Sequence, residues 1–215
     1  MTIKIILVDD HKLMREGLRA LIENEPNMAV IAEAQEGRTA VQLAAKMSPD
    51  VVVMDVSMPD LNGIDATRRI LAGGARTKVL ALSMHVDRRF VTEMLNAGAS
   101  GYLLKDCAFE ELIHAIRTVA GNSTYLSPRI TDIVLQDYVH RGPKNEYSAL
   151  SILTVREREV LQLLAEGRRT KEIASLLGVS VKTIETYRQQ IMEKLEIRSI
   201  AELTKFAVRE GLTSP

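Results

Sequence analysis

Residues 3–10 read IKIILVDD, in which a strand-like run at 3–8 is followed by two aspartates. A second run at 51–54, VVVM, is followed by a third aspartate. Short apolar runs rich in β-branched residues predict strands that are buried on both faces, as in a parallel sheet. Segments of the same kind lie at 28–34, 78–83 and 101–104, so we expect five parallel strands.

Amphipathic stretches separate these strands and are long enough to form crossover helices. They lie at about 12–25, 37–47, 63–72, 87–97 and 108–120. The alternation predicts a doubly wound α/β domain with helices on both faces of the sheet. Ligands of such sheets bind beyond the carboxyl ends of the strands.

The pattern changes after Gly121. Pro128 opens a helix that runs to about Val139, and residues 141–145, RGPKN, read as a break. From Thr154 onward only helical periodicity remains, with interruptions that predict four short helices. We therefore expect a first domain at 1–122, a linker with a helix at 123–149, and a small all-α domain at 150–215.

Composition and charge limit the function classes. The 215 residues are 46% hydrophobic and 26% charged, with a formal net charge of zero. Residues 1–122 hold 14 basic and 16 acidic groups, a balance of −2, whereas residues 153–215 hold 11 and 9, a balance of +2. No apolar run approaches 18 residues, so we expect a cytoplasmic protein with no membrane partner. The single cysteine, Cys107, is interpreted as a packing residue.

Three carboxylates end two of the predicted strands. Asp9 and Asp10 follow the first strand and Asp55 follows the third, so all three should meet at one edge of the sheet. Carboxylates held close together repel one another unless a cation lies between them. Hard oxygen ligands suit Mg²⁺, and Mn²⁺ would also fit.

The same edge should receive Ser83 from the fourth strand and Lys105 from just beyond the fifth. A hydroxyl and a cation added to a set of acids suggest phosphoryl chemistry, with Asp55 as the nucleophile. Lys105 would pair with one phosphoryl oxygen and Ser83 would donate a hydrogen bond to another. Taken singly, an aspartate at a strand end is often a helix cap, and a lone serine or lysine is often solvated. Their recurrence at successive strand ends favours the functional interpretation.

The Asp9-Asp10 pair, residues 55–59 with Asn62-Gly63, Ser83 and residues 101–105 resemble a response-regulator receiver domain over about residues 1–122. The resemblance implies a flavodoxin-like fold with Asp55 as phospho-acceptor. It further implies Mg²⁺ binding by Asp10, Asp55 and the Ser57 backbone carbonyl, phosphate contacts from Ser83 and Lys105, and Tyr102 as the switch aromatic. Many receivers have proline where this chain has Asp106, and the side chain at position 57 varies between receivers.

Residues 170–195 read as a helix, a tight turn at 178–180 and a second helix. Glu185, Thr186 and Gln189 lie one helical turn apart on its exposed face and are candidates for contacting base edges. The candidates for phosphate contacts are Lys171, Lys182, Thr183, Arg188 and Lys194. The alternative is a plain helical bundle with a solvated polar face.

The stretch at 153–167, followed by Lys171 to Ala174 and Val181 to Glu185, resembles the LuxR-type domain over about residues 150–215. Together with the receiver, this is similar to the NarL/FixJ family of response regulators. The resemblance implies a sensor histidine kinase as donor and double-stranded promoter DNA as ligand. It also implies a homodimer in which the helix at about 200–209 supplies contacts, with Ala201, Leu203, Thr204 and Ala207 available for them. Two-fold symmetry then predicts an inverted-repeat operator. Tyr187 stands where the family more often has histidine.

We therefore expect a transcription factor and not an enzyme, apart from Mg²⁺-dependent self-phosphorylation and autodephosphorylation, with RNA polymerase as a further candidate partner. One alternative is a phosphohydrolase with an aspartyl-phosphate intermediate. Such an enzyme would usually have a general-acid aspartate where this chain has Ser57, and it would leave the C-terminal half unexplained. Another alternative is a DNA-binding protein whose receiver no longer signals.

Overall fold

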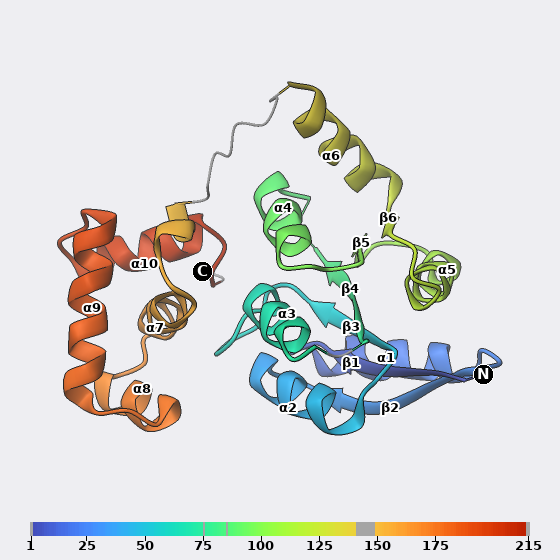
Figure 1. Cartoon of the computed structure of the whole chain (residues 1–215), viewed down its shortest axis with the longest axis horizontal. Coiled ribbons are helices and arrows are strands. Elements are labelled where there is room, and N and C mark those ends of the chain that lie inside the picture. The colour runs from blue at the N-terminus through green and yellow to red at the C-terminus, as the bar shows by residue number, and fades with distance from the viewer. Residues whose placement is uncertain (1, 75, 85, 141–148, 214–215) are drawn as a thin grey trace. The chain divides into compact units, whose positions relative to one another are not determined.

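The computed structural model describes residues 2–74, 76–84, 86–140 and 149–213. The first part alternates strands and helices as β1 (Ile3–Val8), α1 (Lys12–Glu23), β2 (Met28–Ala34), α2 (Gly37–Met47), β3 (Val51–Asp55), α3 (Gly63–Ala72), β4 (Lys78–Ser83), α4 (Arg88–Asn96), β5 (Gly101–Leu104), α5 (Phe109–Ala120), β6 (Tyr125–Leu126) and α6 (Pro128–His140) (Figure 1). The second part is helical, with a 3₁₀ turn (Ala149–Ile152), α7 (Val155–Ala165), α8 (Thr170–Leu177), α9 (Val181–Leu195) and α10 (Ile200–Arg209). None of the described helices is both long and apolar enough to span a bilayer.

The strands form one sheet in the order β2-β1-β3-β4-β5-β6, and every pair is parallel. The doubly wound α/β fold predicted from the sequence is confirmed. The number of strands differs, because six are present where five were expected. The extra strand, β6, is two residues long and follows polar residues, so it leaves no alternating pattern in the sequence.

Two layers of helices cover the sheet. Side chains of α1 and α5 pack with one set of strand residues, including Leu7, Val53 and Leu103. Side chains of α2, α3 and α4 pack with the alternate set, including Ile6 and Met54. Because both faces are covered, β3 is wholly buried and β1 is buried from Ile5 to Val8, which explains the near-continuous apolar sequence of these stretches.

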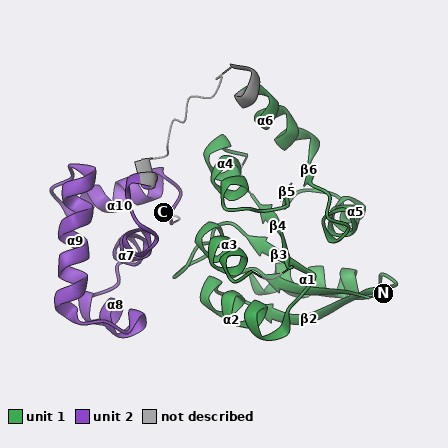
Figure 2. Ribbon diagram, in the orientation of Figure 1, with its two compact units in different colours: residues 1–143 green, residues 144–215 purple. Residues whose placement is uncertain are grey.

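The segment after α5 packs against the sheet. The Ser127 N–H donates to the Tyr102 carbonyl at 3.1 Å, which continues the β5–β6 pairing to the start of α6. Ile130 on α6 is fully buried in the hydrophobic cluster that also holds Val91 and Met94 of α4. The first compact unit accordingly spans Met1–Pro143, and the second spans Lys144–Pro215 (Figure 2).

The second unit has its own hydrophobic core, which contains Leu161, Ile173, Ile184 and residues of α10. A capping box begins α7, since the Thr154 side chain accepts from the Glu157 N–H and the Glu157 carboxylate accepts from the Thr154 N–H.

Between α8 and α9 the chain turns at Gly178, whose φ of 65° lies in the left-handed region. Ser180 then caps α9 by accepting from the Thr183 N–H at 3.0 Å. The predicted helix-turn-helix is present. On α10, Leu203 and Ala207 are buried in the unit's core, whereas Ala201 is exposed and Thr204 is partly exposed. Leu203 and Ala207 are therefore unavailable for the dimer contact expected of this helix, and Ala201 remains available.

Candidate functional site

An acidic pocket lies at the carboxyl edge of the sheet. Asp9 follows β1 and Asp55 ends β3, and both side chains are almost fully buried, at 3% and 4% exposure. The Asp10 side chain is more open, at 31%. The topology brings these three groups together because β1 and β3 are adjacent parallel strands with Val8 opposite Met54.

Lys105 closes the pocket from the end of β5. Its ammonium lies 2.7 Å from Asp9 Oδ2 and 2.7 Å from Asp55 Oδ2, and the side chain is 5% exposed. The Lys105 N–H donates to the Ser83 carbonyl at 2.8 Å, which fixes the start of the loop between β5 and α5. The Lys105–Asp106 peptide bond is trans, as are all peptide bonds of the described residues.

Burial and charge compete at these groups. Burial raises the pKa of Asp55 to about 6, because desolvation and the nearby Asp9 outweigh the opposing effect of Lys105. For Lys105, burial lowers the pKa, but the charges and hydrogen bonds of Asp55 and Asp9 outweigh burial, so its pKa lies above the usual value. The ammonium therefore stays charged and offsets part of the negative charge of the pocket.

The loop after β3 holds Asp55 from the other side. The Ser57 N–H donates to Asp55 Oδ1 at 3.2 Å. Asn62 caps α3 by accepting from the Asp65 N–H, and the next residue, Gly63, passes directly over the β3 backbone. A Cβ atom at Gly63 would lie 1.9 Å from the Asp55 carbonyl oxygen, so only glycine permits this close approach.

Ser83 and Tyr102 lie on the adjacent strands β4 and β5, and both side chains are fully buried. Their side chains share a hydrogen bond. Burial raises the pKa of the Tyr102 hydroxyl to about 12, so it stays protonated and can donate. The ring of Tyr102 is already inside the protein in this state, in contact with the hydroxyl that the sequence placed near the acidic pocket.

The acidic pocket also includes a residue that the sequence analysis missed. His11 Nδ1 lies 2.7 Å from Asp10 Oδ1, and one ligand atom each from Asp9, Asp10, His11 and Asp55 fall within 4.8 Å of one another. The run Asp9-Asp10-His11 was the available signal in the sequence. Clustered carboxylates, two of them buried, form a donor set that fits a hard divalent cation.

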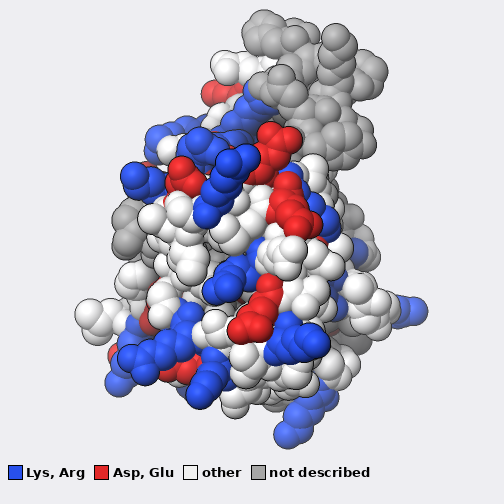
Figure 3. Space-filling model, turned by 90° about the vertical axis from the view of Figure 1, so that its left-hand side faces the viewer, with Lys and Arg blue, Asp and Glu red and all other residues white. Residues whose placement is uncertain are grey.

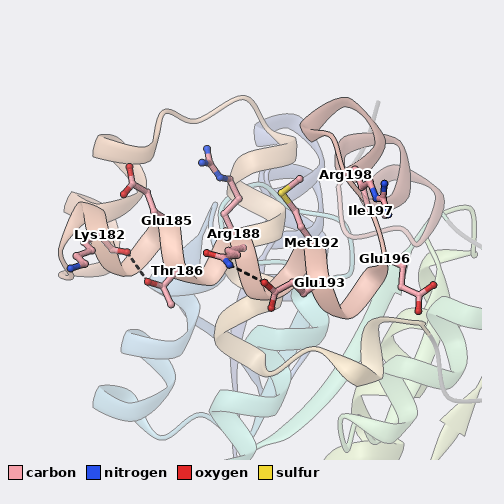
Figure 4. A pocket seen from close by; sticks show the side chains of 10 residues that line it. Lys182, Glu185, Thr186, Arg188, Met192, Glu193, Glu196, Ile197 and Arg198 are labelled. Atoms are coloured by element: carbon pink, nitrogen blue, oxygen red, sulfur yellow. Dashed lines mark hydrogen bonds between the residues drawn. The ribbon is translucent and has the colours of Figure 1, made fainter.

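A second candidate site lies on α9. A groove of about 1120 Å³ runs along its exposed face and continues into the turn after it (Figure 4). Its lining includes five residues that the sequence nominated for DNA contacts: Lys182, Glu185, Thr186, Arg188 and Gln189. Its lining also includes residues that were not predicted from the sequence: Met192, Glu193, Glu196, Ile197 and Arg198. The face viewed in Figure 3 carries lysine and arginine side chains with acidic side chains between them.

The remaining candidates lie at other positions on this unit. Lys171 is exposed in the first turn of α8. The Thr183 hydroxyl lies 2.8 Å from that of Ser180, at the start of α9. Lys194 directs its ammonium at the buried Glu157 carboxylate of α7, at 2.6 and 2.7 Å from the two oxygens. Its predicted phosphate contact stays a prediction, since the structure gives this lysine a partner within the unit.

Comparison with known proteins covers both units. Residues 5–117 match the response regulator receiver domain, and residues 151–207 match the luxR family of bacterial regulatory proteins. The chain is 35% identical to the transcriptional regulatory protein DegU of Brevibacillus brevis, with 97% of this chain and 94% of DegU covered. It is 38% identical to the oxygen regulatory protein NreC of Staphylococcus carnosus, with 97% and 98% covered.

A solved structure is also similar. A LuxR-family two-component response regulator from Aurantimonas sp. SI85-9A1 superposes with a TM-score of 0.62 at 39% identity, over 65% of this chain and 99% of that one. The two matched regions lie in the two compact units, and the relatives span nearly the whole chain. The chain therefore belongs to the two-component response regulators of the NarL/FixJ type, transcriptional regulators that combine a receiver with a LuxR-type DNA-binding domain.

Proposed function

We propose that phosphoryl transfer from a sensor histidine kinase to Asp55 controls dimerisation and the binding of promoter DNA by the LuxR-type domain. The observation that supports this best is the position of Lys105, whose ammonium lies 2.7 Å from both Asp9 and Asp55 at the carboxyl edge of the sheet. A cation held against a buried carboxylate can pass to an incoming phosphoryl oxygen as that carboxylate is modified.

In this proposal an Asp55 carboxylate oxygen forms a bond to phosphorus while the nitrogen–phosphorus bond of the donor histidine breaks and the imidazole leaves with the electron pair. Lys105 then pairs with one phosphoryl oxygen. Mg²⁺, or Mn²⁺, held by Asp9, Asp10, Asp55 and the Ser57 carbonyl, would neutralise carboxylate and phosphoryl charge. Self-phosphorylation from a small phosphodonor and autodephosphorylation would use the same pocket.

In this proposal the buried pair Ser83 and Tyr102 would couple phosphorylation of Asp55 to a change at the receiver surface. A hydrogen bond from Ser83 to the phosphate would draw the hydroxyl toward Asp55 and away from Tyr102, which would free the ring to reorient. The altered face would then favour a homodimer. The functional limits that we propose are a receiver at 1–122, a linker at 123–149 and a DNA-binding domain at 150–215.

On DNA, α9 would lie in the major groove of each half of an inverted repeat. Glu185, Thr186 and Gln189 would contact base edges. The phosphate contacts would come from Lys171, Lys182, Thr183, Arg188 and Lys194. Recruitment of RNA polymerase would follow from binding near a promoter.

The test is selection of DNA sequences by the purified full-length protein, with and without a small phosphodonor and Mg²⁺, beside Asp55→Ala. We expect phosphodonor to sharpen binding to an inverted repeat in the wild type and to have no effect in Asp55→Ala. Asp132→Ala, at an exposed aspartate of α6, is the matched control and should respond like wild type. DNA binding that ignores the phosphodonor would contradict the control by phosphate, and absence of selective DNA binding would contradict the proposed function.

A further inference from the structure

An acidic side chain lies on the face of α9 that the proposed function turns toward DNA. Glu193 is exposed and lines the groove with Thr186 (Figure 4). Gln189 lines the same groove. A carboxylate near the DNA backbone is repelled by the phosphates and weakens binding. Its position on this face is therefore unfavourable for affinity, and its hydrogen-bond partner indicates what it contributes instead.

The neighbour is Gln189, one helical turn earlier. Its side-chain Nε2 donates a hydrogen bond to Glu193 Oε1 at 2.9 Å. A carboxylate can only accept, whereas either end of a carboxamide can take part in a hydrogen bond. Glu193 therefore determines which end of the Gln189 amide is the NH₂ group, and it fixes the direction in which the carbonyl points.

This bond uses one of the two N–H groups of the Gln189 amide. The inference requires that Glu193 takes the N–H that points away from the carbonyl. The remaining N–H then forms, with that carbonyl, a donor and acceptor pair along one edge of the amide. Adenine offers the complementary pair in the major groove, with N7 as acceptor and the N6 amino group as donor. The order of these groups across the groove reverses when adenine and thymine exchange strands, so an amide of fixed direction fits adenine in one strand only.

Thr186, a second candidate for base contact on this face, also makes a hydrogen bond within α9. The Thr186 hydroxyl donates to the Lys182 carbonyl at 3.0 Å, within α9 itself. Thr186 and Gln189 thus each make a hydrogen bond within α9 before any DNA binds. Their side chains therefore lose less conformational entropy on binding.

We propose that Glu193 is a positioning residue that holds the Gln189 carboxamide in the direction that recognises adenine in one strand of each operator half-site. The inference rests on the proposed function, because it assumes that α9 enters the major groove. Glu193 acts through Gln189, so it adds base preference at one position while its charge lowers the affinity for every sequence.

The experiment measures binding of the full-length protein, in the presence of phosphodonor and Mg²⁺, to duplexes that carry each base pair at every position of the selected half-site. Gln189→Ala identifies the position where adenine preference depends on this side chain, with an expected loss of about tenfold. At that position Glu193→Gln should lower the preference for adenine at least about threefold, because a glutamine can either accept or donate and fixes no direction. Preferences at the other positions should be unchanged.

Removal of a negative charge near DNA also raises affinity for every sequence, so the readout is the ratio of affinities at one position. Glu196→Gln is the matched control. It removes the same charge from the same groove and should leave the adenine preference unchanged.

The outcomes distinguish failure of the inference about Glu193 from failure of the proposed function. The inference is wrong if the wild type selects an operator but Glu193→Gln keeps the full preference, if Glu196→Gln lowers it equally, or if Gln189→Ala alters no position. In these cases phosphate-controlled binding of an operator stands, and only the last case also removes Gln189 from the proposed base contacts. If the wild type selects no sequence at all, the proposed function fails and the inference fails with it.

Discussion

Ser83 is a single hydroxyl near both the proposed phospho-acceptor, Asp55, and the proposed switch aromatic, Tyr102. It ends β4 beside the strand that carries Asp55, and its side chain is hydrogen-bonded to the buried Tyr102. A buried hydroxyl that changes partner links a local chemical event to a movement of a large side chain. In the proposed mechanism Ser83 therefore has a role that no other described residue of the pocket duplicates.

We predict that Ser83→Ala weakens phosphate-dependent dimerisation by about tenfold or more, since a hydrogen bond to a charged group contributes about 1.5–3 kcal/mol. The measurement is sedimentation of the full-length protein with and without phosphodonor. Ser123→Ala, at an exposed serine, is the matched control and should behave like wild type. Undiminished dimerisation of Ser83→Ala would rule out the relay through Tyr102.

At the scale of elements, α7 and α9 are joined by one ion pair that also serves a helix cap. The Glu157 carboxylate, 3% exposed, accepts the Thr154 N–H in the capping box and binds the Lys194 ammonium. Burial, the largest influence, raises the pKa of Glu157, but Lys194 and Thr154 together outweigh it, so the pKa lies below its usual value. A group whose pKa is lower when folded stabilises the fold above its unfolded pKa, and this contribution is lost as the pH falls through the folded pKa.

We predict that Lys194→Met lowers the free energy of unfolding of the second unit by about 1–2 kcal/mol at neutral pH, because it leaves a buried carboxylate without its cation. The loss should shrink below about pH 4, where the carboxylate of the variant is protonated. Urea unfolding at both pH values tests this, with Lys205→Met on the exposed side of α10 as control. A variant as stable as wild type at neutral pH would show that the pair does not stabilise the unit.

Much of the element order was predictable because the strand and helix periodicities are strong. β1, β2, β4 and β5 have the residue limits that the sequence indicated, and α9 begins after the predicted cap. β6 was missed because two residues show no alternation. The burial of Glu157 could not be foreseen, since an acidic residue on an amphipathic helix is usually solvated.

The pocket was predictable for a different reason. Parallel strands place their carboxyl ends at one edge, so Asp9, Asp55 and Lys105 could be brought together without knowledge of the loops. His11 and Glu193 were not nominated, because their roles depend on a neighbour's orientation. Sequence periodicity indicates which face a residue occupies but not which hydrogen bond it makes.

At the scale of the whole molecule, each of the two units has its own hydrophobic core. The clusters of the first unit and the cluster around Leu161 share no residue among those described. Units with separate cores can unfold separately unless a large apolar interface couples them.

We predict two transitions when the full-length chain is unfolded in a calorimeter. Leu161→Ala and Leu103→Ala each remove a fully buried leucine, one from each unit, at an expected cost of about 2–5 kcal/mol. Each variant should lower the temperature of one transition and leave the other unchanged. A single transition that moves as a whole in both variants would show that the units unfold together.

The short strand β6 also determines how much of the β5 edge is left unpaired and accessible to other polypeptides. An open strand edge is a template on which a foreign chain can add, and this is a common route to aggregation. Here Tyr125 and Leu126 pair with β5, and α6 follows at once from the bond between Ser127 and Tyr102. A chain cut after residue 122 would lose this cover and present β5 to its neighbours in a crowded solution. The residues that connect the two halves of the regulator thus also cover part of one edge of the receiver sheet.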